Sequence, residues 1–372
     1  MPPKDSPEPR PATASAVRAA SWGVRSVLAL FLFAGALQLM KTGAADLAIL
    51  EPGGVLVRNA GSTLGLGWLG ALIVLSGSPI AATALTLVEA GRLDDIQGFT
   101  MLTGSRLGAA FVVLLTAVIY AWRSGAGGRM KPVSTAVMAL YTTFVLYVPA
   151  AVGGFLLLRW GPFESVDLHF GGGFADLLDF VYGDLIDAVA DLPGAVVFVG
   201  GLLVLLGSFK ILDGVLPHLD DEDIEQGRLA WLRRKWPMFG LGCAVALVTM
   251  SVSVALTVLV PLVAKGYAKR EDIVPYIMGA NITTLGDTLL AAFALNSAVA
   301  VRIVLAGMIT TTILSVLLLA FFYPQLRRSI WRAQRAMVKS RPRLLAFTAA
   351  LFAVPLSLIA VSTWFDALTP VG

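Results

Sequence analysis

Residues 75–91 read LSGSPIAATALTLVEAG and residues 102–111 read LTGSRLGAAF, and the second half of the chain contains a similar pair of segments. That pair reads TMSVSVALTVLVPLVAKG at residues 249–266 and IMGANITTLGDT at residues 277–288. In each half, a Ser/Thr-rich apolar stretch leads through a short turn into a glycine-containing stretch. Interrupted hydrophobic segments at matching places in two halves are typical of membrane transporters built from repeats.

Several positions of the two halves correspond, with nearly equal spacing. The corresponding pairs are Ser76 with Ser251, Ser78 with Ser253, Gly91 with Gly266, and Gly104 with Gly279.

The composition of the whole chain agrees with a membrane protein. Hydrophobic residues make up 57% and charged residues 14% of the sequence, and the mean hydropathy is +0.81. A soluble domain of this length is far less apolar. The pI is near 9.3, but the basic residues lie between hydrophobic segments rather than in one patch. Such a distribution indicates membrane orientation, not a nucleic-acid partner.

Apolar segments of roughly 20 residues, the length needed to cross a bilayer as a helix, set the expected fold. Two further apolar segments, 65–89 and 238–263, are interrupted by Gly, Pro and Ser, and we interpret them as re-entrant hairpins. The expected fold is therefore an all-α polytopic membrane protein with two inverted repeats, each with a hairpin and a broken helix. The seven expected crossings lie near residues 22–40, 99–122, 133–158, 193–212, 273–295, 298–322 and 344–364.

Loop charges predict the orientation, because Lys and Arg concentrate on the cytoplasmic side. With both hairpins re-entrant, most of the 28 Lys and Arg residues fall on one side. The N-terminus is then cytoplasmic, and the C-terminus and the acidic loop between the repeats are extracytoplasmic. The basic residues left on the outer side are Lys41, Arg58, Arg92 and Arg159.

The chain divides into five parts on this interpretation. They are a disordered cytoplasmic tail (1–21), membrane repeat 1 (22–158), an acidic extracytoplasmic loop (159–192), membrane repeat 2 (193–322), and a basic cytoplasmic loop with the last transmembrane helix (323–372).

The stretch LFLFAGALQLM, the Ser-containing hairpins and the Gly-Ala-Asn-Ile-Thr-Thr run at 279–284 resemble the sodium:phosphate symporter family, related to type II sodium-dependent phosphate cotransporters. The resemblance covers about residues 25–325. It implies two hairpins, one from each side, that enclose sodium and phosphate at mid-membrane. In that family each hairpin usually carries Gln-Ser-Ser-Ser, and the following helix carries Gly-Ala-Asn-Ile-Gly-Thr-Thr.

This sequence departs from both family motifs. Residues 250–253 read Met-Ser-Val-Ser, so two hydroxyl groups remain and the amide is missing. The first-repeat equivalent of the asparagine motif is Gly-Ser-Arg-Leu-Gly at 104–108. Fewer oxygen ligands therefore remain for a hard cation such as sodium.

Polar residues of the interrupted segments are the candidate substrate and ion ligands. Free backbone N–H groups at the hairpin tips would attract an anion, and hydroxyl groups can donate to phosphate or turn an oxygen toward a cation. The alternative is that small Ser and Thr residues only help helices to pack. The candidates are Ser76, Ser78, Thr83, Arg106, Ser251, Ser253, Thr257, Asn281, Thr283, Thr284 and Asp287.

Arg106 and Asp287 are the most specific of these candidates. Both fall inside predicted membrane segments at similar depth, where an ionisable side chain is costly and normally has a partner. The arginine could bind phosphate through two parallel hydrogen bonds, and the carboxylate could hold a cation or a proton. Alternatively, the two form a structural ion pair that holds the repeats together.

The expected function is cation-coupled symport of inorganic phosphate, or a similar oxyanion, across the plasma (inner) membrane by alternating access. Sodium is the expected coupling ion and a proton the alternative; membrane lipid is the other expected partner. We expect no enzyme activity, no cofactor and no metal site, because nucleophile–base pairs, nucleotide motifs and metal-ligand spacings are missing. Two alternatives remain: an uncoupled or proton-coupled carrier or exporter without sodium sites, and a non-transporting phosphate sensor or scaffold. Sequence leaves the oligomeric state open.

Overall fold

The protein is helical throughout the part of the chain that is described by the computed structural model. The described residues are 12–47, 51, 53–123, 130–160, 172–213, 234–249, 255, 256, 259, 263 and 272–368. All regular secondary structure in these ranges is α-helix, which confirms the predicted all-α class.

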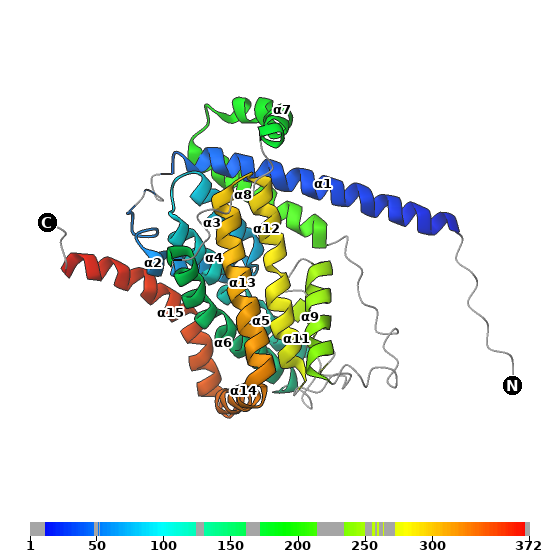
Figure 1. The fold of residues 1–372 in the computed structure, drawn as a ribbon, viewed down its shortest axis with the longest axis vertical. Helices are drawn as coiled ribbons and strands as arrows, with labels where there is room; N and C mark the ends of the chain where they lie inside the picture. The colour runs from blue at the N-terminus through cyan, green and yellow to red at the C-terminus, as the bar shows by residue number, and fades with distance from the viewer. Residues whose placement is uncertain are drawn as a thin grey trace.

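The described helices gather into one bundle, from which α1 and α15 extend on opposite sides (Figure 1). In chain order they are α1 (Ala12–Ala44), α2 (Ala60–Val74), α3 (Ser78–Glu89), α4 (Asp95–Ala109), α5 (Phe111–Arg123), α6 (Met130–Trp160), α7 (Gly172–Val189), α8 (Gly194–Asp213), α9 (Lys235–Thr249), α11 (Ile273–Thr283), α12 (Leu285–Ala294), α13 (Ala298–Phe321), α14 (Tyr323–Val338) and α15 (Arg341–Leu368).

Within the described ranges, seven helical stretches are long and apolar enough to cross a membrane, and each coincides closely with a predicted crossing. Helices α4 and α5 together form one of them, and so do α11 and α12. The chain therefore has the architecture of a multi-pass membrane protein. The seven stretches are Gly23–Ala44, Asp95–Ala121, Pro132–Trp160, Gly194–Ile211, Ile273–Ala294, Ala298–Phe321 and Arg341–Val361.

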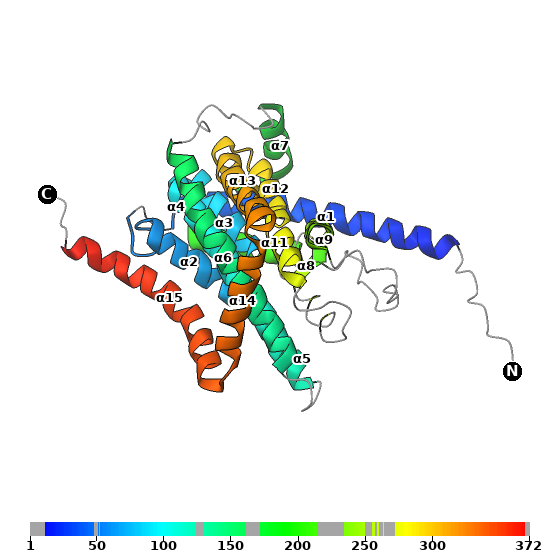
Figure 2. The same ribbon diagram turned by 60° about the horizontal axis from the view of Figure 1, so that its bottom comes forward.

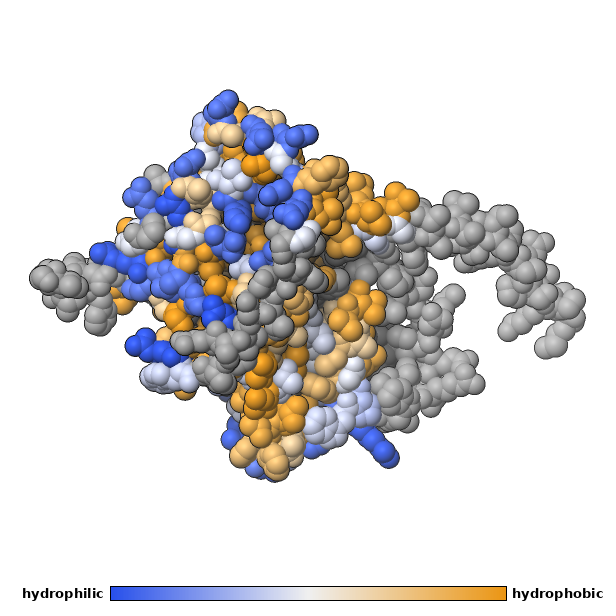
Figure 3. All heavy atoms as spheres, turned by 45° about the horizontal axis from the view of Figure 1, so that its top comes forward, coloured by the Kyte–Doolittle hydropathy of each residue, from blue (hydrophilic) through white to orange (hydrophobic). Residues whose placement is uncertain are grey.

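The outer surface has the polarity that this architecture requires. Large apolar side chains are exposed on the spanning helices, such as Ile313 on α13 and Leu356 on α15. Figure 3 shows hydrophilic side chains gathered at the end of the molecule that carries α7, with hydrophobic side chains along the flank. Extended apolar surface of this kind is stable against lipid rather than against water.

The first interrupted segment forms two short helices joined by a tight turn. Leu75 ends α2 with φ of 56°, and Gly77 directly precedes α3. The turn lies against the middle of the span that α4 and α5 form, because a Cβ on Gly77 would come within 2.9 Å of the carbonyl oxygen of Ser105.

Both ends of this α2–α3 hairpin lie at the opposite, N-terminal end of α4. Before α2, the carbonyl of Val57 accepts a hydrogen bond of 2.8 Å from the Gln97 side chain. At the end of α3, Val88 fills the space in which a Cβ of Gly98 would lie. The chain thus runs along α4 to the turn and returns to the end from which it started.

Two helix pairs, α2 with α4 and α9 with α11, pack through the same contacts. In each pair two glycines let the backbones meet: a Cβ on any of these four glycines would lie 2.0 or 2.1 Å from the facing carbonyl oxygen. The contacts of the second pair follow those of the first by one constant offset along the chain. The repeat in the sequence therefore extends to helix packing. The contacts are Gly67 with Met101, Gly104 with Leu64, Gly242 with Tyr276, and Gly279 with Phe239.

Helices α1 and α8 also form a close pair, and they run in opposite directions. A Cβ on Gly43 would lie 2.6 Å from the carbonyl oxygen of Gly194, and one on Gly201 would lie 3.0 Å from that of Ala36. The two contacts are equivalent. In each, a glycine of one helix faces the carbonyl of the residue seven positions before the other helix's glycine: Gly194 precedes Gly201 by as many residues as Ala36 precedes Gly43. Such self-complementary contact is the kind found across a twofold axis.

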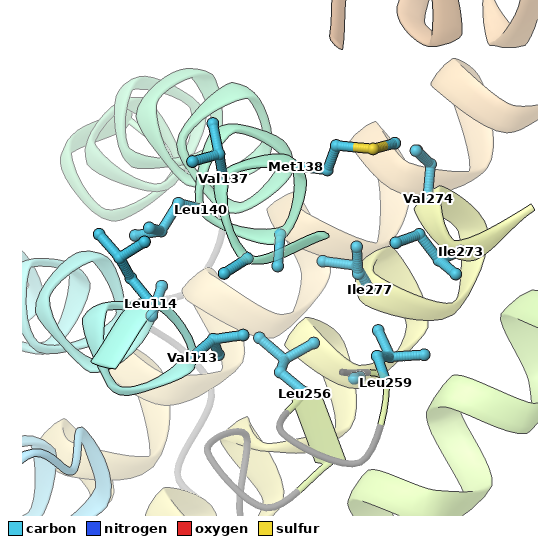
Figure 4. Close-up of a cluster of buried hydrophobic side chains, with 14 of the residues drawn as sticks. Val113, Leu114, Val137, Met138, Leu140, Leu256, Leu259, Ile273, Val274 and Ile277 are labelled. Carbon is cyan, nitrogen blue, oxygen red and sulfur yellow. The ribbon is translucent and has the colours of Figure 1, made fainter. Parts of the chain in front are cut away.

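The core near one end of the bundle combines residues from both halves of the chain. Figure 4 shows side chains of α5, α6 and α11 pointing toward one another, with Leu256 and Leu259 beside them. Val113, Leu140 and Ile277 are all fully buried. The two halves therefore share a hydrophobic core rather than forming separate domains.

Three segments that were predicted to be irregular contain helices. Helix α1 begins at Ala12, so residues 12–21 of the tail predicted at 1–21 are helical; residues 1–11 lie outside the described part. The acidic loop at 159–192 contains α7, and the basic loop from 323 begins with α14. Charged segments of this kind form helices when one face packs against the protein, and in α14 the buried residues recur every fourth position: Leu326, Ile330 and Gln334.

The second predicted hairpin, 238–263, is described mainly in its first arm. That arm is α9, which packs on α11 as α2 packs on α4. Most of the rest of this hairpin lies outside the described residues. Among the exceptions is Ala255, whose carbonyl oxygen accepts a hydrogen bond of 2.9 Å from the Tyr276 hydroxyl.

Candidate functional site

Two of the spanning helices are interrupted, and the candidate site lies at these interruptions. In the first half, α4 ends at Ala109 and α5 begins at Phe111. In the second half, α11 ends at Thr283 and α12 begins at Leu285. Each break is one residue long, Ala110 in the first half and Thr284 in the second, and both residues keep right-handed helical dihedral angles.

Arg106 and Asp287 meet at this place and form an ion pair between the two halves. Nη2 of Arg106 donates a hydrogen bond to Oδ1 of Asp287 at 3.1 Å. The same Nη2 donates to the Thr288 hydroxyl, which itself donates to Oδ1 of Asp287 at 2.8 Å. The two charged side chains are 1% and 2% exposed. The structure therefore contains the Arg106–Asp287 ion pair, which the sequence left open as one of two arrangements.

Helix ends favour the charges that lie on them. Arg106 is in the last turn of α4, where the partial charge of a helix terminus is negative, and Asp287 is in the first turn of α12, where it is positive. Each of the two buried charges therefore lies at a helix end whose partial charge has the opposite sign.

The pair does not use all of its hydrogen-bonding atoms. Nε of Arg106 and Oδ2 of Asp287 are buried and have no hydrogen-bond partner among the described residues. A buried charged group with an unsatisfied atom is destabilising, so these two atoms are sites at which a ligand would restore lost hydrogen bonds. Nε is a donor and suits an anion, whereas Oδ2 is an acceptor and suits a cation or a proton.

A small cavity lies on the carboxylate side of the pair. Asp287 forms part of its wall together with Phe33 of α1, Ser208 and Phe209 of α8, and Leu290 of α12. It has room for about one water molecule. This size excludes a polyatomic anion in this conformation.

A second polar network joins α6 to the break between α11 and α12. The side-chain amide of Asn281 donates to the Thr143 hydroxyl at 3.1 Å. The Tyr147 hydroxyl donates to the backbone carbonyl of Asn281 at 2.6 Å. Thr284 donates to the same carbonyl at 3.2 Å. Asn281 follows Gly279 as Arg106 follows Gly104, so the amide and the guanidinium occupy equivalent positions in the two halves.

The other predicted hydroxyl ligands of the first half belong to the hairpin. Ser76 lies in the turn and is partly exposed, and Ser78 is a buried residue of the first turn of α3. They flank Gly77, which packs on the residue next to Arg106. Thr83 donates to the carbonyl of Pro79 in its own helix at 2.8 Å, so its hydroxyl keeps only acceptor capacity.

The remaining predicted ligands are not brought to the ion pair. Thr283 donates to the Cys243 carbonyl at 3.0 Å and thereby links α11 to α9. Ser251, Ser253 and Thr257 lie outside the described residues. Over the residues that are described, no group of three or more His, Cys, Asp or Glu side chains could hold a metal ion.

Three residues of the site did not emerge from the sequence. Thr288 is next to Asp287 and completes the ion pair, while Thr143 and Tyr147 hold Asn281 from α6. Threonine and tyrosine are common in membrane helices, so their composition gives no signal. The i, i+4 spacing of Thr143 and Tyr147 places both on one helix face and is the only available clue.

Comparisons of the chain with protein-family models, with curated proteins and with solved structures found no match. The chemistry of the site therefore rests on its own residues.

Proposed function

We propose that the protein is a secondary carrier that moves inorganic phosphate, or a similar oxyanion, together with a cation. The observation that carries the proposal is the buried Arg106–Asp287 pair between the two halves of the chain, which keeps a donor and an acceptor without partners among the described residues. A guanidinium binds phosphate oxygens through parallel N–H donors. Support also comes from the N-terminus of α3, where Gly77 provides no side-chain cap and an anion can interact with backbone N–H groups.

Charge balance at this pair gives a reason for coupling. An oxyanion at Arg106 would stand beside the carboxylate of Asp287, and two negative charges at such distances repel strongly in a buried site. A sodium ion or a proton at Oδ2 removes this repulsion. Cation and anion therefore bind best together, which is the thermodynamic requirement for symport.

The packing of the two halves supports alternating access between inverted repeats. The α2–α3 hairpin starts and ends at the same end of α4, as a re-entrant hairpin from the outer side would. The antiparallel α1–α8 contact is of the kind that a twofold rotation between inverted halves would produce, and it supports the proposal in that sense. Movement of one half against the other would expose the ion pair to each side in turn.

The proposed location is the plasma (inner) membrane, with the N-terminus cytoplasmic and the C-terminus extracytoplasmic. Acidic α7 and basic α14 lie at opposite ends of the molecule (Figure 1), and the basic end belongs on the cytoplasmic side. An odd number of crossings then separates the two termini.

The decisive experiment is uptake of radiolabelled phosphate into proteoliposomes that contain the purified protein. An inward sodium gradient is compared with an equal potassium gradient and with a pH gradient. We expect accumulation of phosphate above the external concentration only with sodium. Lack of phosphate accumulation under every gradient, in vesicles shown to contain folded protein, would refute the proposal.

A proton-coupled carrier is the second candidate, because the protonatable carboxylate of Asp287 is present while the family's glutamine amide is replaced by Met250. Uptake driven by the pH gradient and indifferent to sodium would favour it. Phosphate binding without flux would instead favour the sensor that the sequence leaves open.

A further inference from the structure

Helix α14 occupies a defined place at the boundary of the membrane region. Phe322 alone separates it from α13, and two residues separate it from α15. Both neighbours contain apolar spans, Ala298–Phe321 and Arg341–Val361. Figure 1 shows α13 lengthwise and α14 nearly end-on, and Figure 2 shows α15 leaving the turn after α14 and running back beside the bundle. The crosswise helix therefore lies where two spans end.

The two faces of α14 differ sharply in polarity. Leu326 and Ile330 are buried in the same hydrophobic cluster as α5, α6 and α11. On the other face, Arg328, Arg332 and Arg335 are exposed. The apolar face holds the helix on the bundle, so the arginine face is turned away from the core.

The arginines surround two hollows rather than extending separately into solvent. One hollow is formed by α14 alone, and the other lies between α14 and Tyr141 of α6. Arg328 and Arg332 line both of them. The first is lined by Pro324, Arg327, Arg328, Trp331, Arg332 and Arg335, and the second by Tyr141, Gln325, Arg328, Ser329, Arg332 and Ala333.

Three of the arginines around these hollows have no carboxylate partner within the part of the chain that the structure describes. Arg328, Arg332 and Arg335 form no ion pair with any Asp or Glu of the described ranges. The guanidinium of Arg335 stacks over the Trp331 ring at 5.1 Å, which fixes its position without neutralising it. Several guanidinium groups around one hollow repel one another, and a bound anion would relieve this repulsion.

We propose that this arginine hollow binds the headgroup of an anionic phospholipid. A phosphodiester offers the oxygens that guanidinium groups bind in parallel, and the acyl chains can lie along the apolar spans on either side of α14. Trp331 has the amphipathic ring that favours the membrane interface. Clusters of basic residues beside a membrane span are attracted to anionic lipid. This binding is independent of the transport proposed above.

The experiment measures lipid binding to the full chain purified in detergent. Short-chain phosphatidylglycerol is titrated into the wild type, into the triple variant Arg328→Gln/Arg332→Gln/Arg335→Gln, and into the control Lys339→Gln/Arg341→Gln/Arg343→Gln. The control removes equal charge from exposed residues of the same region that line neither hollow. Phosphatidylcholine and free glycerol phosphate are titrated in parallel.

We expect the dissociation constant for phosphatidylglycerol to rise at least about ten-fold in the triple variant and less than about three-fold in the control. Phosphatidylcholine and free glycerol phosphate should bind far more weakly to the wild type. Equal losses in both variants would mean a diffuse charge effect and would overturn the site. Equal binding of phosphatidylcholine would also overturn it, and tight binding of free glycerol phosphate would assign the hollow to a soluble anion instead.

Discussion

The ion pair at the interface of the two halves has two possible roles: it binds a ligand, or it is a structural link between the halves. A buried pair contributes little to stability when compared with apolar residues of similar size, but removal of one partner strands a charge. The Arg106–Asp287 pair leaves one atom of each side chain without a partner among the described residues, so a ligand could bind at these atoms, and substitution can decide between the two roles.

Replacement of the arginine tests the anion role. We expect Arg106→Ala to weaken phosphate binding at least about ten-fold, because a charge-assisted bidentate contact is lost. Binding is measured by equilibrium titration of labelled phosphate. Arg159→Ala is the matched control, since Arg159 is exposed at the end of α6. Equal phosphate affinity in Arg106→Ala and the wild type would exclude this residue as the anion ligand.

Replacement of the carboxylate tests the coupling role. Asparagine resembles a neutralised aspartate, so Asp287→Asn should bind phosphate without the help of a cation. We expect the ratio of phosphate affinities with and without sodium to fall to about one, while the affinity itself stays within about three-fold of the sodium-bound wild type. An unchanged sodium dependence would place the cation elsewhere.

Measurements of folding stability show whether a variant loses phosphate binding because a charge is missing or because the protein is misfolded. We expect Arg106→Met to lower the free energy of unfolding by about 3–5 kcal/mol, because it strands the Asp287 carboxylate. The double variant Arg106→Met/Asp287→Leu should recover most of this loss and yet bind no phosphate. Unfolding in mixed micelles gives the stabilities. A double variant that retains phosphate transport would instead identify the pair as a structural link.

At the level of helices, glycine contacts decide how closely the paired helices approach. In α9, a Cβ on Gly242 would lie 2.0 Å from the carbonyl oxygen of Tyr276, whereas one on Gly240 would meet nothing within 4 Å. We therefore expect Gly242→Ala to destabilise the protein by about 2 kcal/mol or more and to reduce its folded yield. Gly240→Ala, two positions away in the same helix, should be neutral or stabilising by up to about 1 kcal/mol.

The equivalent substitution in the first half extends this prediction to the repeat. A Cβ on Gly104 would lie 2.1 Å from the carbonyl oxygen of Leu64. Gly104→Ala should therefore lower the free energy of unfolding about as much as Gly242→Ala. Size-exclusion profiles and unfolding midpoints of the three variants provide the measurement. Equal behaviour of Gly240→Ala and Gly242→Ala would contradict the close packing of α9 on α11.

The spanning helices could be predicted because a run of apolar residues is a local property that one sequence displays. The helical nature of α7 and α14 could not, since their stability comes from one face that packs on the bundle, and charge on the other face reads as a loop. Arg106 and Asp287 could be identified from the sequence because charges inside apolar spans are rare. Thr288 and Tyr147 could not be identified from the sequence, because hydroxyl residues are common. Only the fold brings Thr288 to the ion pair and Tyr147 to Asn281.

At the scale of the whole molecule, we expect the separation of charge to determine the orientation in the membrane. The α7 end carries Asp176, Asp179, Asp184 and Asp187, and the α14 end carries the arginines of the arginine hollow. Both hairpins must be re-entrant for these ends to lie on the sides that the positive-inside rule prefers. If both hairpins crossed instead, acidic α7 would be cytoplasmic, so the side on which α7 lies tests the hairpins and the orientation together.

Cysteine labelling of intact cells can measure that side directly. In a Cys243→Ser background, a membrane-impermeant maleimide should label Asp184→Cys on α7 and Val55→Cys before α2 without permeabilisation. It should label Arg332→Cys on α14 only after the membrane is opened. All three positions are exposed in the protein, so access depends on the membrane alone. Protection of Asp184→Cys in intact cells would mean that the hairpins cross, and the two halves could then not present the Arg106–Asp287 pair to each side in turn.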